Sequence, residues 1–198
     1  MVKIIDFMKK RKLFSTLVIT GIIGIILGGV FLLFLNDKSL EIMGSSINTY
    51  FSNVKSGSIN YSNNFIVGLT NSFSIGIIIW LLGISMVGLI LIILMFGIKC
   101  FMMSISFFSI IHLYGLNGLL LSIIYIIPYF INTLLLFILS YYAVSFSILI
   151  FKYFFRGADY NRKVIIKRYF KILGLCLIGF LITTLIDVFL VPKILLLF

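Results

Sequence analysis

Long apolar runs, separated by short polar or basic segments, make up most of the chain. Most of these runs approach or exceed the length of about 20 residues that crosses a bilayer as a helix. They lack the alternation of apolar and polar residues that the strands of a membrane barrel need. The pattern therefore predicts an all-α, polytopic helical membrane protein, formed as a single domain over residues 1–198. The predicted transmembrane helices, about five, cover residues 13–35, 69–98, 100–115, 130–151 and 172–191.

The longest polar segment, residues 36–64, carries few charges and many Ser and Asn residues. Ser39 is a suitable N-cap for a helix in this segment, and Gly57 is a suitable residue to end it. We therefore expect an external amphipathic helix at residues 40–56, with its apolar face on the bilayer, on the ends of the spans or on a partner protein. The apolar residues that recur there at helical spacing are Leu40, Met43, Ile47, Tyr50, Phe51 and Val54.

A single charge, Lys99, interrupts the apolar sequence between residue 65 and Pro128. A lysine in mid-bilayer is costly, so we place Lys99 at the turn between the second and third spans. Beyond it, residues 115–118 combine two glycines with an asparagine, which favours a break in the helix. Two layouts are then open: a short outer-face or re-entrant helix at residues 119–127, or one long helix that is kinked at the break.

Basic residues gather in two clusters beside apolar runs. The first cluster, at the N-terminus, consists of Lys3, Lys9, Lys10, Arg11 and Lys12. The second, in the loop at residues 152–171, consists of Lys152, Arg156, Arg162, Lys163, Lys167, Arg168 and Lys171. By the positive-inside rule both clusters lie in the cytoplasm, which puts the loop at residues 36–64 and the C-terminus outside. We therefore expect a multi-pass protein of the cell membrane with a cytoplasmic N-terminus.

The composition supports a membrane protein and explains the net charge. Hydrophobic residues make up 62% of the chain and charged residues 11%, whereas soluble domains contain about 45–50% and about 25%. The net charge of +11 comes largely from the two basic clusters, whose nearest partners are anionic lipid headgroups. We therefore expect membrane lipids as partners and no nucleic acid.

Small residues form a stripe along the first span. Gly24 and Gly28 are one helical turn apart, and Gly21 lies on the same side. Such a stripe lets another helix approach closely. A glycine-rich span also contains this spacing by chance, so both interpretations stay open.

The chain contains few residues that could carry out catalysis. It has one histidine, His112, and Asp187 is the only acidic residue within a predicted span. No metal-binding, serine-hydrolase or phosphate-loop motif is present, and the two cysteines, Cys100 and Cys176, lie far apart in apolar runs. Because ionisable residues in spans are candidates for function, Asp187 is a candidate for a contact with Lys193 or a partner. We expect no enzymatic activity, no cofactor and no metal.

The central part of the chain, residues 63–128, contains a characteristic series of motifs. They are Asn63-Asn64, Gly68, Trp80-Leu81-Leu82-Gly83, Gly88, Gly97-Ile98-Lys99, Tyr114-Gly115-Leu116-Asn117-Gly118 and Ile127-Pro128. This series resembles the stage II sporulation protein M family, and the basic N-terminus, the external loop and the five-span layout are similar too. Relatives often carry a polar pair after the proline and an acidic residue soon after. This chain departs from that pattern, because Pro128 is followed by Tyr129-Phe130-Ile131-Asn132.

The resemblance implies a non-enzymatic membrane anchor and scaffold of the sporulation engulfment machinery. Its implied partners are the stage II sporulation proteins D and P, which degrade peptidoglycan at the septum, and its implied location is the mother-cell and septal membrane. It implies no small-molecule substrate. The alternative is a small membrane permease or transporter subunit, because interrupted helices such as the one predicted at residues 115–118 often line substrate sites.

For a scaffold, the outer face of the membrane is the expected partner surface. The amphipathic helix and the break that contains Asn117 both lie outside in the predicted topology. Tyr50 and Phe51 are the candidate anchors, because aromatic side chains concentrate binding energy at interfaces. The other candidate partner or packing contacts are Asp187 and the glycine stripe of Gly24 and Gly28.

Overall fold

The computed structural model describes the backbone of residues 2–85, 87–156 and 162–196. Side chains are described for residues 12–36, 38–85, 87–116, 118–153 and 163–196. This described part of the chain is helical almost throughout and contains no strand. Its elements are α1 (Val2–Leu33), α2 (Asp37–Ser56), α3 (Tyr61–Ile84), α4 (Gly88–Arg156), α5 (Arg162–Leu185), the π-helix η1 (Ile186–Leu190) and α6 (Val191–Leu195).

Five helical segments are long and apolar enough to cross a membrane. They are Lys12–Leu33, Tyr61–Ile84, Gly88–Leu116, Gly118–Tyr153 and Lys163–Leu195. Large apolar side chains such as Ile26, Ile90 and Ile178 are exposed along them, as expected of surfaces that face lipid. The prediction of an all-α, multi-pass membrane protein is therefore confirmed. The fourth and fifth spans extend past their predicted bounds at both ends, because the helices continue beyond the most apolar part of each run.

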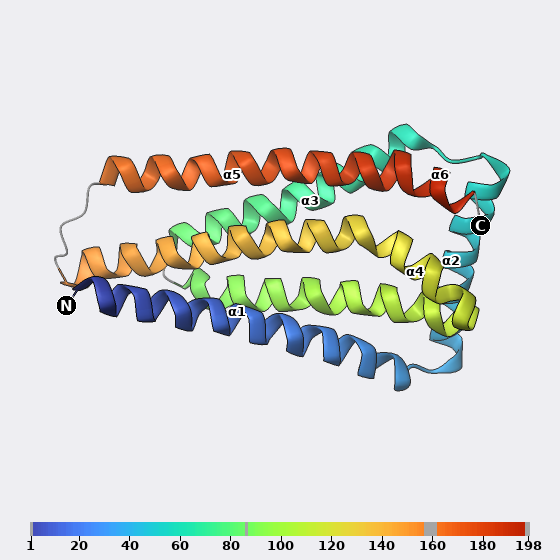
Figure 1. Ribbon diagram of the computed structural model, residues 1–198, viewed down its shortest axis with the longest axis horizontal. Helices are drawn as coiled ribbons and strands as arrows, with labels where there is room; N and C mark the ends of the chain where they lie inside the picture. The colour runs from blue at the N-terminus through green and yellow to red at the C-terminus, as the bar shows by residue number, and fades with distance from the viewer. Residues whose placement is uncertain (1, 86, 157–161, 197–198) are drawn as a thin grey trace.

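The spans form an elongated bundle with one helix across its end (Figure 1). The helices α1 and α5 and the two arms of α4 run along the bundle, and α3 lies behind them. The helix α2 crosses the end at which the C-terminus lies, and we call this the α2 end. The N-terminus lies at the opposite end (Figure 1), together with the end of α4, which carries Lys152, and the start of α5, which carries Lys163, and we call that the basic end.

The turn between the second and third spans lies just before Gly88, so Lys99 is inside a helix. The helix α3 takes 24 residues, enough to cross a bilayer, and Ser85 then leaves it with an extended backbone (φ −95°, ψ 143°). Gly88 packs against the carbonyl oxygen of Leu82 so closely that no Cβ atom would fit there. The predicted turn at Lys99, after a span at residues 69–98, is therefore wrong. The apolar sequence is uninterrupted by charge at the actual turn, so nothing in the composition marks it.

Gly115 divides α4 into a first arm (residues 88–114) and a second arm (residues 116–156). Its backbone has φ 59° and ψ −138°, a left-handed φ that favours glycine, and the chain reverses direction there. A break near this position was predicted, but neither predicted layout is correct. Residues 119–127 form no separate helix and do not prolong the third span, because they begin the fourth. The second arm stays helical through Pro128, since lost backbone hydrogen bonds are tolerated in spans that neighbouring helices support.

The amphipathic helix α2 is confirmed, with a different start. It begins after Asn36, whereas Ser39 was the predicted N-cap, and Gly57 (φ 68°) ends it as predicted. Its apolar face lies on the ends of the spans, where the buried Val54 packs in one cluster with Val191 of α6. The helix therefore closes one end of the bundle.

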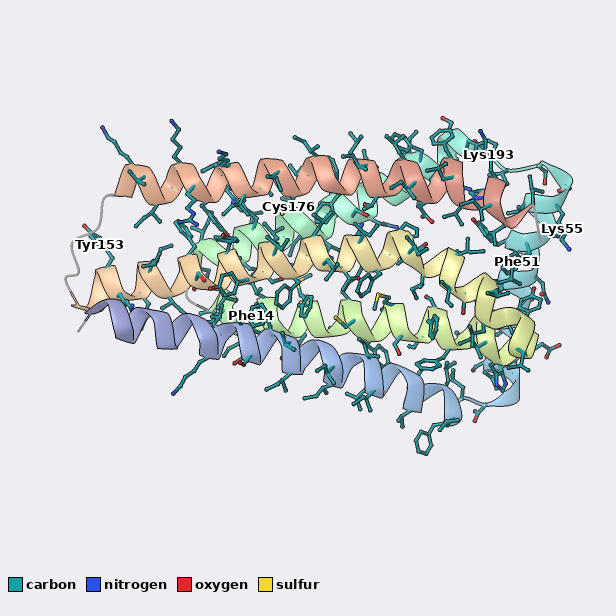
Figure 2. The ribbon with its side chains drawn as sticks, in the orientation of Figure 1. Phe14, Phe51, Lys55, Tyr153, Cys176 and Lys193 are labelled. Carbon is teal, nitrogen blue, oxygen red and sulfur yellow. The ribbon has the colours of Figure 1, made fainter. Side chains whose placement is uncertain are left out.

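The largest buried cluster joins α3, both arms of α4 and α5. Its buried members are Ile79, Ile92, Leu136, Leu139, Ala143, Val144, Tyr169, Cys176 and Phe180. Small residues let the helices approach at this cluster: Gly76 packs on the ring of Phe180 and Gly83 on Ala143. Cys176, labelled on α5 in Figure 2, and Cys100 of the first arm are both buried free thiols.

Candidate functional site

The predicted anchors Tyr50 and Phe51 lie between α2 and the ends of the spans. The ring centroid of Tyr50 is 5.8 Å from that of Tyr125, and the centroid of Phe51 is 5.5 Å from that of Tyr114. The Tyr114 hydroxyl also donates a hydrogen bond of 2.5 Å to Oδ1 of Asn48 on α2. Figure 2 labels Phe51 at this contact between α2 and the bundle. Both rings therefore hold α2 in place, and a role in binding a partner stays a prediction.

The glycine stripe of α1 packs on the first arm of α4. A Cβ atom on Gly24 would lie 2.6 Å from the carbonyl oxygen of Gly97, and one on Gly28 would lie 2.6 Å from that of Phe101. The hydroxyl of Ser104 adds a hydrogen bond of 2.6 Å to a carbonyl oxygen of α1. The stripe therefore brings two spans of this chain into backbone contact.

A polar cavity of about 120 Å³ lies where α3, the two arms of α4, α5 and η1 meet. It collects charged and polar side chains that are far apart in the sequence. Lys99 comes from the first arm, Asn132 from the second arm and Asp187 from η1. The lining residues are Gly68, Asn71, Ser72, Lys99, Pro128, Tyr129, Asn132, Thr183, Thr184 and Asp187.

The cavity lies within the membrane-spanning part of the bundle. At about 1.5 Å per helical residue, Lys99 lies roughly 17 Å from the start of the first arm, and Asp187 lies about 12 Å from the end of α6. The hydrocarbon core of a bilayer is about 30 Å thick, so both positions fall within segments that cross it. Ionisable residues at such depth are rare and costly, which makes them candidates for function.

Hydrogen bonds satisfy only part of the polar lining. Nδ2 of Asn132 donates a bond of 2.9 Å to Oγ of Ser72, whereas its Oδ1 is buried without a partner among the described residues. Neither Lys99 nor Asp187 forms an ion pair or a hydrogen bond with any described residue. The cavity therefore holds two opposite charges that make no direct contact with each other, and an amide oxygen without a hydrogen-bond partner among the described residues.

The carboxylate of Asp187 is carried by an irregular part of the last span. Residues Ile186–Leu190 form the π-helix η1, and Pro192 follows in α6. Short π-helical segments inside α-helices occur frequently at functional sites. Here the irregular turn includes the one acidic residue that reaches the cavity.

A row of tyrosines connects α2 with the cavity. Burial, and then the negative charge of Asp187, raise the pKa of the Tyr50 hydroxyl. The rings of Tyr50 and Tyr125 are in contact, and the hydroxyl oxygens of Tyr125 and Tyr129 are 3.2 Å apart. Tyr129 itself lines the cavity. The helix across the end of the bundle is thus linked to the polar site below it.

Of the charged and amide residues of the cavity, Asp187 was predictable from the sequence as a candidate, whereas Lys99 and Asn132 were not predicted. Lys99 was missed because the turn was placed on it. Two spans of similar length between Tyr61 and Gly115 would turn near the middle of that segment, which puts Lys99 inside the second of them. Asn132 stood out only as a departure from the family motif after the proline.

The remaining sequence candidates lie elsewhere. His112 is exposed and does not line the cavity. The side chain of Asn117 lies outside the described residues, although its backbone belongs to the turn after Gly115. The described residues contain no cluster of three or more His, Cys, Asp or Glu side chains that could hold a metal ion.

Comparisons with protein-family profiles, curated proteins and solved structures found no match to this chain. The residues that carry the resemblance nevertheless fall at distinct points of the fold. The backbone N–H of Asn63 donates to the side chain of Asn60 at the start of α3, and Gly115 forms the hairpin. Gly68 and Pro128 line the polar cavity, as does Lys99. The motif residues are thus spread over the cavity, the hairpin and other parts of the bundle, and the family stays a prediction.

Proposed function

We propose that the protein is a non-enzymatic membrane scaffold of the sporulation engulfment machinery, as the resemblance implies. The single observation that supports this function best is α2. It is a packed helix of 20 residues lying across the ends of the spans, with its aromatic side chains turned inward. A helix held in this way offers a rigid polar face to proteins outside the membrane.

In the proposed topology the basic end lies in the cytoplasm and the α2 end lies outside. Basic residues at the basic end favour this orientation through the positive-inside rule and the anionic lipids of the inner leaflet. Single cysteines at Ser45 on α2 and at Lys163 at the start of α5, in a chain without Cys100 and Cys176, test it. An impermeant thiol reagent applied to intact cells should label the cysteine at position 45 and not the one at position 163.

The proposed partner surface is the outward face of α2. Ser45, Thr49 and Ser52 are exposed and recur at helical spacing on this face, whereas Tyr50 and Phe51 contact the spans. Its proposed partners are the stage II sporulation proteins D and P. Small polar side chains along one face allow another protein to pack closely against the helix.

The test changes residues on this outward face and leaves the contacts between α2 and the spans intact. The variant Ser45→Arg/Thr49→Arg/Ser52→Arg should lose the two peptidoglycan hydrolases in an affinity pull-down from sporulating cells, with its membrane level unchanged. The matched control, Ser58→Arg/Ser62→Arg, alters exposed residues at the same end but outside α2 and should retain them. Full retention of both hydrolases by the α2 variant would exclude this surface.

The second candidate function is a small permease or transporter subunit. The polar cavity is the observation that favours it, because transporters place their binding sites near the bilayer midplane between discontinuous helices. Purified protein in liposomes should then release or take up a trapped small solute faster than liposomes with the Lys99→Met variant. Equal rates would leave the scaffold as the function of the isolated chain.

A further inference from the structure

We propose that the polar cavity binds a small zwitterion, a molecule with an ammonium group and a carboxylate or phosphate group a few atoms apart. This inference goes beyond the scaffold function and does not depend on it. It differs from the sequence-based expectation of no small-molecule substrate, because the positions of Lys99 and Asp187 in one cavity emerge only from the structure.

The charges in the cavity match a ligand that carries both signs. Lys99 and Asp187 line the same small space without forming an ion pair with each other or with other described residues. Charged groups inside the membrane-spanning part of a bundle are unfavourable unless a direct ion contact or hydrogen bonds satisfy them. A simple anion would neutralise Lys99 and repel Asp187, and a simple cation would do the reverse. A zwitterion neutralises both side chains at once and leaves no net charge in the membrane.

The uncharged polar groups of the lining determine the orientation of the ligand in the cavity. The hydroxyls of Thr183 and Thr184 donate to the carbonyl oxygen of Phe180 at 3.0 and 2.8 Å. Each hydroxyl proton is therefore already used in a hydrogen bond, and the free lone pairs of each oxygen can accept a hydrogen bond from a ligand. These acceptors lie on the same segment of the chain as Asp187, whereas the amine of Lys99 comes from α4. The ammonium group of the ligand therefore faces α5 and η1, and its anionic group faces Lys99.

The size of the cavity limits the ligand to a compact molecule. A volume of about 120 Å³ equals the share of roughly four water molecules in the liquid. An amino acid with a small side chain fits this limit, and so does the phosphoethanolamine end of a lipid headgroup. The two sources present the same chemistry to Lys99 and Asp187, and the experiment separates them.

The test measures binding to the full-length protein in nanodiscs that contain only anionic lipid. Titration calorimetry and thermal unfolding are carried out with glycine, with phosphoethanolamine, and with acetate and methylamine together as separated half-ligands. We expect one of the zwitterions to bind and to raise the unfolding temperature, and the half-ligands to bind at least 10-fold more weakly. Glycine identifies a free solute as the source. Phosphoethanolamine alone identifies a lipid headgroup.

The variants test whether the binding occurs in this cavity. Lys99→Met and Asp187→Asn should each weaken binding at least 10-fold. Lys193→Met is the matched control, because Lys193 is exposed at the α2 end outside the cavity (Figure 2), and its affinity should equal that of the wild type. Thr184→Val keeps the shape of the site and removes one acceptor, so it gives a readout even if a charge variant does not fold. We expect it to weaken binding about 3-fold.

Three results would overturn the proposal. The first is a wild-type protein that binds neither zwitterion. The second is half-ligand binding as tight as zwitterion binding, which would indicate two independent ion contacts. The third is a set of cavity variants, Thr184→Val included, whose affinities equal that of Lys193→Met. None of these results bears on whether α2 binds the hydrolases, so the scaffold function is judged separately.

Discussion

Among the hollows in the described part of the bundle, two among the spans differ in size and in chemistry. The larger one, about 390 Å³, lies near the basic end between α3, the second arm of α4 and α5, and its lining is apolar and aromatic. Within it, the ring centroid of Tyr169 is 5.5 Å from that of Trp80 and 4.1 Å from that of Phe146. The smaller one is the polar cavity at mid-depth, with Lys99 and Asp187 in its lining.

The difference shows why size is a poor guide to function in a membrane protein. An apolar groove that faces lipid has a small free-energy cost, because acyl chains fill it and its lining carries few polar groups that would lose water. A polar cavity among the spans is unfavourable for every group that lacks a partner, and it persists when something compensates for it. We therefore propose ligand binding at the smaller hollow and expect lipid in the larger one.

The largest expected effect is on stability when one charge of the polar cavity is removed. Lys99→Met or Asp187→Leu alone leaves the opposite charge without a counter-charge, and each should lower the free energy of unfolding by about 3 kcal/mol. The double variant has no such charge and should be more stable than either single variant. Denaturant unfolding of the protein in nanodiscs measures this. Additive losses in the double variant would show that the two charges do not interact.

A smaller effect is expected from adding one methyl group at each hollow. At the groove, Gly83→Ala would bring Cβ against the Tyr169 hydroxyl and against Ala143, so we expect a loss of about 2 kcal/mol. At the cavity, a Cβ atom on Gly68 would lie 3.1 Å from a methyl group of Thr184. Gly68→Ala should therefore lower the free energy of unfolding by less than Gly83→Ala does.

The control for both glycine variants is Gly174→Ala on α5. A Cβ atom there would have no neighbour within 4 Å, so the unfolding temperature should not fall. Thermal unfolding of the three variants side by side gives the ranking. If Gly83→Ala were as stable as Gly174→Ala, the aromatic base of the groove would be looser than the structure indicates.

A still smaller effect on stability is expected from Asn132→Leu. The change removes a buried Oδ1 without a partner together with one hydrogen bond to Ser72, so stability should stay within about 1 kcal/mol of the wild type. The binding of glycine or phosphoethanolamine should nevertheless weaken. The control, Ser72→Ala, removes only the hydroxyl and should lose about 1 kcal/mol because it leaves the amide of Asn132 without its acceptor. A large loss of stability in Asn132→Leu would mean that the amide is structural.

The general architecture followed from local patterns in the sequence. Run length gave the class of protein and the number of spans, and helical spacing with Gly57 gave α2 and its end. The break at Gly115 was predictable because a glycine supplies a left-handed φ without strain. Each of these features depends on residues that are close together in the chain.

The polar cavity could not be predicted in the same way. Its lining residues come from four membrane spans, and whether they meet depends on how far each helix is displaced along its neighbour. The turn was predicted at Lys99, 11 residues after its actual position at Gly88. The prediction therefore placed this lysine at the membrane surface, whereas the structure places it within the membrane-spanning part of the bundle. The free-energy cost of burying a lysine was the reason for placing Lys99 at a turn on the membrane surface. That placement was wrong because the structure puts the opposite charge of Asp187 in the same cavity.

The smallest expected effect concerns the apolar groove and whether lipid fills it. Trp80 is the only tryptophan of the chain, it lines the groove, and its indole N–H has no partner among the described residues. Lipids with brominated acyl chains should therefore quench most of the tryptophan fluorescence of the reconstituted protein.

Ile166→Ala, which shortens an exposed residue of the lining, should increase the quenching. It should change the free energy of unfolding by less than about 1 kcal/mol, because an acyl chain replaces the lost contacts. Ile26→Ala on α1, exposed to lipid but outside the groove, should change neither quantity. Weak quenching in all three proteins would mean that the groove is closed to lipid, and the contrast between the two hollows would then rest on the polar cavity alone.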